Sequence, residues 1–553
     1  MRHTHAFRIA AAGAAASLIV FLSGTPSLAQ SATAGRDSHR ALQLTLDEAV
    51  RRAVDNNPDL AVLRLGAQAE AETVSEALSA YAPVFSTVLG RSSNTTPPTN
   101  FLLGDTGIDA RDWFSSTGVR QRLSRGSGTW SVSWDASRTA TNNPLSSFQP
   151  SLQSGFQVAF SQPLLKDRRI DTARLQSVVA SRNQESAKLR YDESVVQTLA
   201  AVKQAYWTLK AAAANVGVQQ RSLDLAHDLA RENRSRVDLG QTPPIDLVQA
   251  ESEVAQRREN LIRATAAAED AEDHLRRLIM DPADTSFWQV HLDPVDDAAG
   301  GVAVSDIDAV VANALAERYD LARARNDLEN ARTNVDFLTN QKLPDVRFEA
   351  SYRGNGLGGT ELLRTGAFPG VITGSRSTGF GDVLGQTFGR NYPAWSFGLT
   401  ASYTLGRSYE EAGSARAELE RRQMSRKISS LELKTAETIR QAARQVRSSA
   451  ERVDAAKAGA TLAKSRLDTE QRRYEVGLST SFLVTQAQRD LLQAEVNLLQ
   501  ATLDHQSSVV NFEALQQAPA LADGNASTPA TPVLQLPTSE PRGLFRAGSG
   551  AGF

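Results

Sequence analysis

The chain of 553 residues contains no cysteine. This absence excludes disulfides, thiol chemistry and an acceptor for an N-terminal lipid anchor. An excess of charge of either sign is also missing, because 60 basic residues face 62 acidic ones. The sequence therefore has no electrostatic footprint for nucleic acid. Its seven histidines are scattered, and no pair has the spacing of metal ligands on a helix. His227, His274 and His505 fall within predicted helices and are interpreted as packing or surface residues. We expect no metal and no cofactor.

Long hydrophobic runs are almost absent as well. Only Ile9–Leu22 is continuously apolar; it follows Arg2 and Arg8 and precedes Ser27-Leu28-Ala29. This pattern predicts a secretory signal peptide over residues 1–29, cleaved after Ala29, with a polar leader over 30–44. The alternative, a membrane anchor, is weaker because the run is shorter than the roughly 20 residues of a spanning helix. The chain is thus predicted to be exported, and any membrane segment must be built of strands.

An internal duplication is present in the sequence. Leu46–Arg91 aligns with Ile307–Tyr352 at a spacing of 261 positions, and a second match at 237 positions places Arg236 on Arg473 and Gly240 on Gly477. Each copy has the same order of short helices, strands, a long helix, a turn and a returning helix. We predict a first repeat over 45–279, a connector over 280–304, and a second repeat over 305–517. The proline-, alanine- and glycine-rich segment 518–553 is predicted to be a disordered tail.

Heptad spacing predicts two long helical hairpins, over 168–279 and 408–517. Val195, Leu199, Val202, Tyr206 and Leu209 recur at alternating intervals of four and three, which is typical of a coiled-coil seam. Proline punctuates the helices: Ala82-Pro83 and Leu343-Pro344 end the helices that precede the strand regions.

Strands are predicted over 83–163 and 345–405, where apolar and small polar residues alternate. Trp130, Val132 and Trp134 alternate with Ser131 and Ser133, for example. We interpret Asn94–Asp112, Thr139–Gln153 and Gly354–Pro393 as loops. The number of strands is about four per chain and becomes six if Val119–Leu123 and Thr129–Ala136 form an extra hairpin around the turn at Arg125–Gly128.

The apolar face of these strands needs a partner. The helices already bury their apolar stripes against one another, so lipid is the simplest remaining partner, with the polar face lining water. A few strands cannot satisfy their edges in a bilayer, so several copies must close one barrel. The alternative of another class is a secreted coiled-coil stalk or adhesin with a soluble sheet.

In this arrangement the residues resemble the TolC-like outer-membrane efflux protein family. The resemblance covers about residues 44–517. The motifs that carry it are Leu46-Asp47-Glu48-Ala49-Val50, Asn56-Asn57-Pro58-Asp59-Leu60, Gln162-Pro163-Leu164-Leu165 and Arg473-Tyr474-Glu475-Val476-Gly477-Leu478-Ser479-Thr480. It implies a mainly α-helical protein with transmembrane β-structure, in which four strands from each copy of a homotrimer close a 12-stranded barrel in outer-membrane lipid. A helical tunnel then crosses the periplasm of a Gram-negative bacterium.

The resemblance also implies partners. The far end of the tunnel is expected to meet a periplasmic adaptor protein that docks an inner-membrane pump, or a type I secretion transporter. The protein is then the exit duct of a tripartite efflux system, and a type I protein-secretion duct is the alternative.

The same resemblance assigns two sets of site residues. The adaptor-docking tips carry over onto Gly240 and onto Val476, Gly477, Leu478, Ser479 and Thr480, although glycine at these turns is also what any helix C-cap needs. A periplasmic gate carries over onto Tyr474 and Asp246, as a phenol–carboxylate pair between hairpins; the alternative is that both are solvated surface residues. The family's latch arginine would fall at Ser479, and its constriction acids at Leu483 and Gln486, so these parts are absent here.

An enzyme is not expected. Gly354-Asn355-Gly356-Leu357-Gly358-Gly359 has the spelling of a dinucleotide-binding loop and follows a strand. Such a site also needs a helix that opens at the glycines and an acidic residue about 20 positions later. Neither is predicted here.

Overall fold

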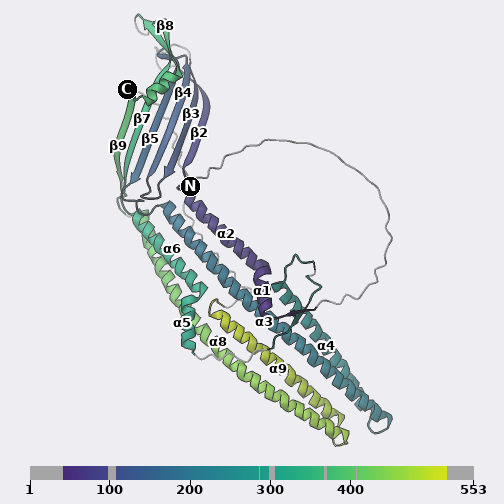
Figure 1. Ribbon diagram of the computed structural model, residues 1–553. Helices are drawn as coiled ribbons and strands as arrows, with labels where there is room; N and C mark the ends of the chain where they lie inside the picture. Colours follow the sequence, from purple (N-terminus) through teal and green to yellow (C-terminus); the bar gives the residue numbers. More distant parts are fainter. Residues whose placement is uncertain are drawn as a thin grey trace, which may run out of the picture.

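The computed structural model describes residues 41–97, 107–285, 287–297, 306–366, 370–406 and 408–519. The predicted signal peptide and nearly all of the predicted tail lie outside these residues. The molecule is elongated, with a curled sheet at one end and long helices running away from it (Figure 1). Both copies of the duplication contribute to each end.

Each copy opens with two short helices. In the first copy these are α1 (Leu46–Asn56) and α2 (Pro58–Ser79), and in the second α5 (Ile307–Glu317) and α6 (Tyr319–Gln341). The side chain of Asn57 accepts hydrogen bonds from the first amides of α2, and Pro58 follows at a position where its missing N–H costs nothing. The local sequence therefore sets where these helices begin.

Two helical hairpins form most of the length. The first joins α3 (Thr172–Asp238) to α4 (Pro244–Ile279), and the second joins α8 (Tyr409–Glu475) to α9 (Ser481–Leu515). At about 1.5 Å per residue, helices of this length reach roughly 100 Å. The long helical stretches predicted by the heptads are present, with ends that differ by a few residues. Beside the sheet, α2 packs on α3, α3 on α6 and α6 on α8, so α2 and α8 flank the helical layer.

The sheet is antiparallel throughout and curls along its width (Figure 1). Its strand order is β2-β3-β4-β5-β7, and β8 and β9 both pair with the far edge of β7, at different heights. The strands are β2 (Val84–Thr96), β3 (Ile108–Arg122), β4 (Thr129–Thr141), β5 (Phe148–Pro163), β7 (Asp345–Thr365), β8 (Val371–Thr378) and β9 (Tyr392–Ser402). The extra hairpin around Arg125–Gly128 is therefore real, as β3 and β4.

Three segments predicted as loops are more ordered than expected. Much of 94–112 and 139–153 lies in β2, β3, β4 and β5, because serine, threonine and asparagine are accepted in strands whose polar face meets water. The glycine-rich segment Gly354–Pro393 holds the end of β7, then β8 and α7 (Phe380–Phe388). The prediction of loops was wrong for these parts.

The glycines of β7 have a packing role. A Cβ placed on Gly354 or Gly356 would lie within 2.3 Å of a backbone oxygen of α7, and one on Gly358 would meet the side chain of Val383. Only glycine leaves room for α7 to lie on the strand, where Val383 and Thr387 are buried. The G-x-G-x-x-G spelling thus reports a helix seat on a strand.

A short parallel pair of strands, β1 (Ala41–Leu44) and β6 (His291–Pro294), was not predicted. It ties the end of the polar leader to the connector. Buried Tyr206 of α3 donates its hydroxyl to the carbonyl of Leu44 at 3.0 Å, within the largest apolar cluster of the helical region. The fold class is confirmed: a mainly helical, duplicated chain with long hairpins and a curled antiparallel sheet.

Candidate functional site

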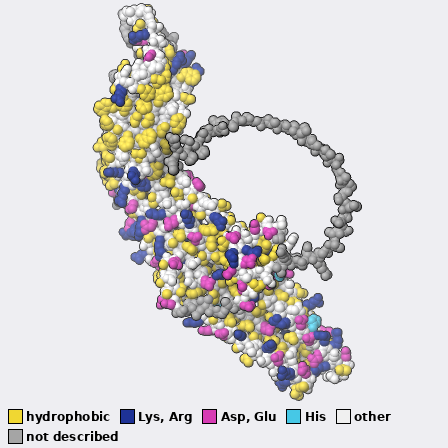
Figure 2. Space-filling view, viewed as in Figure 1, with side chains coloured by type: hydrophobic (Ala, Val, Ile, Leu, Met, Phe, Trp, Pro, Cys, Tyr) yellow, Lys and Arg dark blue, Asp and Glu magenta, His cyan; other side chains and the backbone are white. Residues whose placement is uncertain are grey.

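The two faces of the sheet differ sharply in chemistry. Cross-strand registers place the apolar side chains of all the long strands on one face. They include Phe85, Leu89, Val119, Trp130, Val132, Trp134, Phe156, Val158, Phe160, Phe348, Tyr352, Trp395, Phe397 and Leu399. Figure 2 shows hydrophobic side chains gathered over the sheet, with Lys and Arg below them toward the helices. Trp395 and Phe397 are 69% and 68% exposed, which a water-soluble sheet would not tolerate in such number.

The opposite face is polar and internally hydrogen-bonded. Ser116 donates to Asp135 at 2.6 Å, and Arg353 lies 3.9 Å from the same carboxylate. On the neighbouring strands Ser351 and Ser396 share a hydrogen bond of 2.8 Å. One lipid-compatible face and one water-compatible face are what a transmembrane barrel wall requires.

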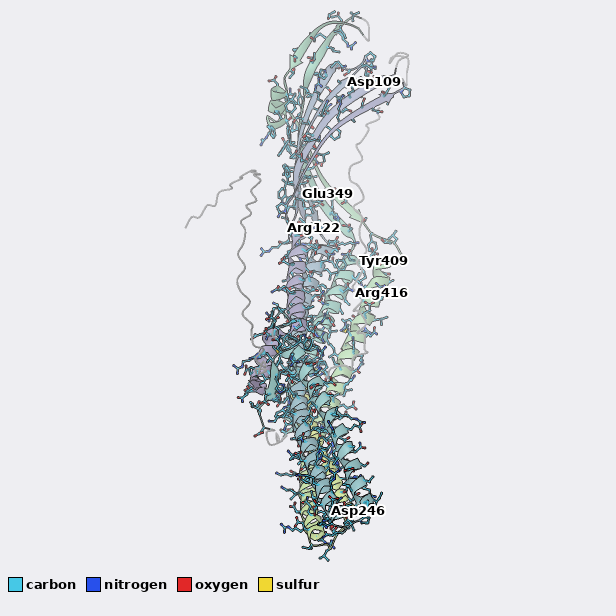
Figure 3. The ribbon with its side chains drawn as sticks, turned by 90° about the vertical axis from the view of Figure 1, so that its right-hand side faces the viewer. Asp109, Arg122, Asp246, Glu349, Tyr409 and Arg416 are labelled. Carbon is cyan, nitrogen blue, oxygen red and sulfur yellow. The ribbon has the colours of Figure 1, made fainter. Side chains whose placement is uncertain are left out.

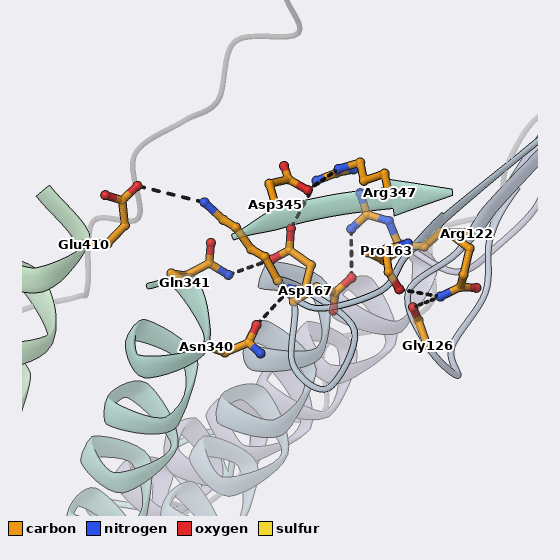
Figure 4. Close-up of polar contacts among 12 residues, drawn as sticks. Arg122, Gly126, Pro163, Asp167, Asn340, Gln341, Asp345, Arg347 and Glu410 are labelled. Carbon is orange, nitrogen blue, oxygen red and sulfur yellow. Dashed lines mark hydrogen bonds and ion pairs between the residues drawn. The ribbon is translucent and has the colours of Figure 1, made fainter. Parts of the chain in front are cut away.

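A belt of polar contacts fixes the sheet to the helices (Figure 4). Asp167, between β5 and α3, accepts from Gln341 at 2.6 Å and from Arg347 at 3.3 Å, and its backbone amide donates to Asn340. Arg347 also donates to Asp345 at 2.8 Å. This belt joins the first copy to the second where strands hand over to helices, so the wall and the helical layer are positioned as one unit.

The two hairpin turns lie at the end of the molecule farthest from the sheet. Figure 3 places Asp246 at this end and Asp109 at the opposite one. Gly240 and Gly477 have φ of +70° and +77°, and each closes its helix with the same pair of backbone hydrogen bonds. Both glycines therefore cap their helices in the left-handed conformation that favours glycine. A Cβ on either would meet nothing within 4 Å, so the turns are open to solvent.

The second turn exposes apolar side chains. Val476, Leu478 and Phe482 are between 63% and 72% exposed. Thr480 caps α9 by accepting from the amide of Leu483, and Ser479 donates to Glu470 at 2.7 Å. Backbone capping thus holds the turn rigid while its leucine, valine and phenylalanine point away from the protein.

The hairpins meet at a buried polar node, defined here as Tyr474, Asn233 and Ser481. The Tyr474 hydroxyl of α8 donates to the side-chain oxygen of Asn233 in α3 at 2.5 Å. The Asn233 amide in turn donates to the Ser481 hydroxyl of α9 at 2.7 Å and to the backbone carbonyl of Asp246 in α4 at 3.3 Å. All four long helices therefore converge on one asparagine, which is fully buried.

Arg236 covers this node from the side. Its guanidinium lies 4.1 Å from the centre of the Tyr474 ring and donates to the Tyr474 carbonyl at 3.2 Å. Burial raises the pKa of the Tyr474 phenol above its ordinary value, and this outweighs the opposing charge of Arg236. The phenol therefore stays protonated near neutral pH and remains a donor.

The structure brings the predicted gate residues to one place. Tyr474 is buried rather than solvated, and Asp246 enters through its backbone carbonyl, while the phenol's hydrogen-bond partner is Asn233. The carboxylate of Asp246 contributes an electrostatic effect on Tyr474. A direct Tyr474–Asp246 pair between hairpins stays a prediction. Asn233, Ser481 and Arg236 were missed; the signal available was the repeat itself, which aligns Arg236 with Arg473 and Asn233 with Glu470.

A second inter-hairpin contact lies farther up the helices. Glu253 of α4 is buried and accepts from Arg257 at 2.7 Å and from Arg489 of α9 at 3.2 Å. Burial alone would raise the pKa of Glu253, but the hydrogen bonds from these two guanidiniums outweigh it and lower the pKa. This ion cluster joins the two hairpins electrostatically.

Across the residues that the structure describes, no three His, Asp or Glu side chains gather as they would around a metal ion. His505 is buried and shares a hydrogen bond of 3.0 Å with Ser449, as a packing residue would. Within the same part of the chain, no helix has both the length and the hydropathy needed to cross a membrane.

Comparison with known proteins agrees with this geometry. The model of the outer membrane efflux protein family matches residues 49–279 and 310–516, so the chain belongs to this family. Among curated proteins, none matches the chain by sequence at a significant level.

Solved structures share the fold at low sequence identity. The CmeC outer-membrane channel of Campylobacter jejuni has a TM-score of 0.60 and 14% identity, covering 85% of each chain. VceC of Vibrio cholerae has a TM-score of 0.57 and 14% identity, covering 86% of this chain and 96% of its own. MtrE of Neisseria gonorrhoeae, described in an open state, has a TM-score of 0.56 and 17% identity, covering 87% and 93%.

The chain is therefore an outer-membrane efflux channel of a Gram-negative bacterium. Its sheet lies in the outer membrane and its helices extend into the periplasm. The family and its structural relatives are channels and not enzymes.

Proposed function

We propose that three copies of this chain form the exit duct of a tripartite efflux system, carrying substrates from the periplasm or from a docked inner-membrane pump to the exterior. The observation that carries the proposal is the two-faced sheet with both of its edges open. Among the described strands, β2 and β9 each have neighbours on one side only. An open edge inside a bilayer leaves backbone donors and acceptors unpaired at a cost of several kcal/mol each.

The helical layer has open flanks on the same sides. The helix α2 leads into β2 and α8 follows β9, so each open strand edge continues into an outer helix. These two helices expose large apolar residues, including Val62 and Leu65 on α2 and Leu433 and Leu462 on α8. A ring of copies would bury both the strand edges and these side chains through one head-to-tail contact. The resemblance to the family supplies the number three.

Adaptor docking is assigned to the hairpin turns. Gly240 and Gly477 keep both turns narrow, and Val476, Leu478, Ser479 and Thr480 present a capped, apolar surface at the second. An apolar patch at the tip of a charged helical body is suited to a partner protein that covers it.

The gate is assigned to the junction of the two hairpins. The node of Tyr474, Asn233 and Ser481, together with Asp246, holds α3 and α4 against α8 and α9. Opening the duct's inner end requires these hairpins to separate. Breaking a buried hydrogen bond leaves its partners unsatisfied at a cost of ~1–3 kcal/mol, which an adaptor's binding energy can offset.

Two experiments test this function. The purified mature protein should insert into planar bilayers as a trimer, and Tyr474→Phe or Asp246→Ala should raise its single-channel conductance. Variants no more conductive than the unmutated protein would reject the gate. In cells, Ser479→Cys, the sole thiol of the chain, should crosslink to a periplasmic adaptor. Recovery of the mature protein as a detergent-independent monomer would reject the duct.

A further inference from the structure

The first copy contributes twice as many long strands as the second. Between α2 and α3 stand β2, β3, β4 and β5, whereas β7 and β9 are the long strands between α6 and α8. The shorter β8 extends the far edge of β7 above β9. Six strands therefore form the wall in the described residues, where the family resemblance implied four.

The additional hairpin, β3 and β4, is part of the wall along its full height. Every residue of β2 pairs with β3, from Val84–Arg120 to Thr96–Ile108, and β3 pairs with β4 from Arg122–Thr129 to Ala110–Thr141. Both strands exceed the roughly 9–11 residues that a tilted strand needs to cross a bilayer. They are therefore long enough to be transmembrane strands.

The hairpin also obeys the two-faced pattern. Val119, Trp130 and Trp134 lie on the apolar face, and Gly118, Ser133 and Asp135 lie on the polar face. The contact of Asp135 with Ser116 and Arg353 runs across the polar face from β3 to β7. A hairpin folded away from the wall would carry no reason for this match.

We propose that the complete barrel has eighteen strands, six from each of three copies, and that its lumen admits bulky hydrated cargo that a twelve-stranded barrel would exclude. The trimer is taken from the proposed function. Because the six strands alternate in direction, β2 and β9 are antiparallel, and β2 of one copy can pair with β9 of the next. The ring then closes with no free edge.

The width follows from the strand number. Barrel diameter grows roughly linearly with the number of strands, so eighteen strands give a lumen about half as wide again as twelve. Barrels of 16–18 strands enclose an aqueous channel. Size selection in this duct then falls to the hairpin end, and the outer-membrane segment passes what that end admits.

A deletion variant provides the matched comparison. Removing residues 98–146 takes out β3 and β4 and joins β2 to β5. Carrying the registers through sets Phe85 opposite Val158, so both faces keep their chemistry in a twelve-stranded product. Ser351→Cys, on the polar face of β7, is then introduced into both chains, which otherwise hold no thiol.

The readout is labelling of that thiol on intact cells by maleimide-polyethylene glycols of graded mass. The full chain should accept larger reagents than the deletion variant, while Leu399→Cys on the apolar face should react with neither. Equal size limits in the two chains would overturn the proposal.

Strand counting by cryo-electron microscopy of the unmodified protein in lipid nanodiscs decides the case independently, including where the deletion variant does not assemble. Eighteen wall strands support the proposal. A trimer with twelve overturns it and leaves the exit duct standing, whereas absence of a membrane-inserted trimer rejects the proposed function itself.

Discussion

The two copies of the duplication share their middle and differ at their ends. In both, a helix of 67 residues turns through a left-handed glycine into a shorter returning helix. At the membrane end the first copy has four long strands, while the second has two, with α7 seated on β7. At the periplasmic end the first turn carries Gln241 where the second carries Leu478. Duplication fixed the helical scaffold, and each copy then specialised where it meets lipid or a partner.

The largest expected effect breaks the difference between the faces of β9. Phe397→Arg places a charge on the apolar face and should destabilise the inserted protein by about 2–4 kcal/mol. Ser396→Arg, one residue away on the polar face, should have little effect. Unfolding by urea in lipid vesicles measures both. Equal losses from the two variants would mean that the faces are not lipid and water.

The buried node separates the two hairpins' roles. Asn233→Ala removes the acceptor of Tyr474 and the donor to Ser481, so we expect a loss of ~1–3 kcal/mol together with raised single-channel conductance. Glu470, at the equivalent repeat position, accepts only at the outer turn, from Ser479 and Arg473 among the described contacts. Its alanine variant should leave the conductance unchanged; a conductance that rises equally in both variants would argue against a gate at Asn233.

The two turns offer a matched pair for docking. Leu478→Asp should weaken adaptor binding at least tenfold, about 1.4 kcal/mol, because it places a charge in the apolar patch. Gln241→Asp at the equivalent place in the first turn should weaken it less. Surface plasmon resonance with the crosslinked adaptor measures both, and thermal unfolding should show neither variant destabilised. A greater loss from Gln241→Asp would transfer docking to the first turn.

The smallest effect concerns pH. Because the pKa of Glu253 is lowered in the folded protein, its contribution to stability is present above the ordinary carboxyl pKa and is lost as pH falls through the lowered value. The stability difference between the unmutated protein and Glu253→Gln should therefore be constant near neutral pH and shrink below about pH 4. Thermal unfolding of both proteins over this range provides the measurement. A gap independent of pH would show that the cluster acts by packing alone.

Sequence periodicity predicted the parts of the fold that rest on repeated local rules. Heptads in α3 and alternation in β4 and β9 each name a buried face, and Pro83 and Pro344 mark where helices stop. The pattern failed where a residue's role is set by a distant partner. The glycines at 354, 356 and 358 are compatible with a loop until α7 is seen lying on them.

The site was predictable to a similar degree. The turns at Gly240 and Gly477 follow from local geometry, since a left-handed residue must end each helix. Asn233 could not be identified, because a polar residue in a long charged helix looks solvated until four helices converge on it. The pairing of β1 with β6 spans about 250 residues and carries no local signal.

The central claim is that the aromatic face of the curled sheet contacts lipid while the opposite face contacts water. Single cysteines at positions 395 to 400 of the otherwise cysteine-free chain can each carry a nitroxide label in lipid vesicles. Collision rates with oxygen and with a water-soluble nickel complex then report each site's surroundings. We predict a period of two, with oxygen favoured at 395, 397 and 399 and nickel at 396, 398 and 400. Equal nickel access at all six positions would contradict the account.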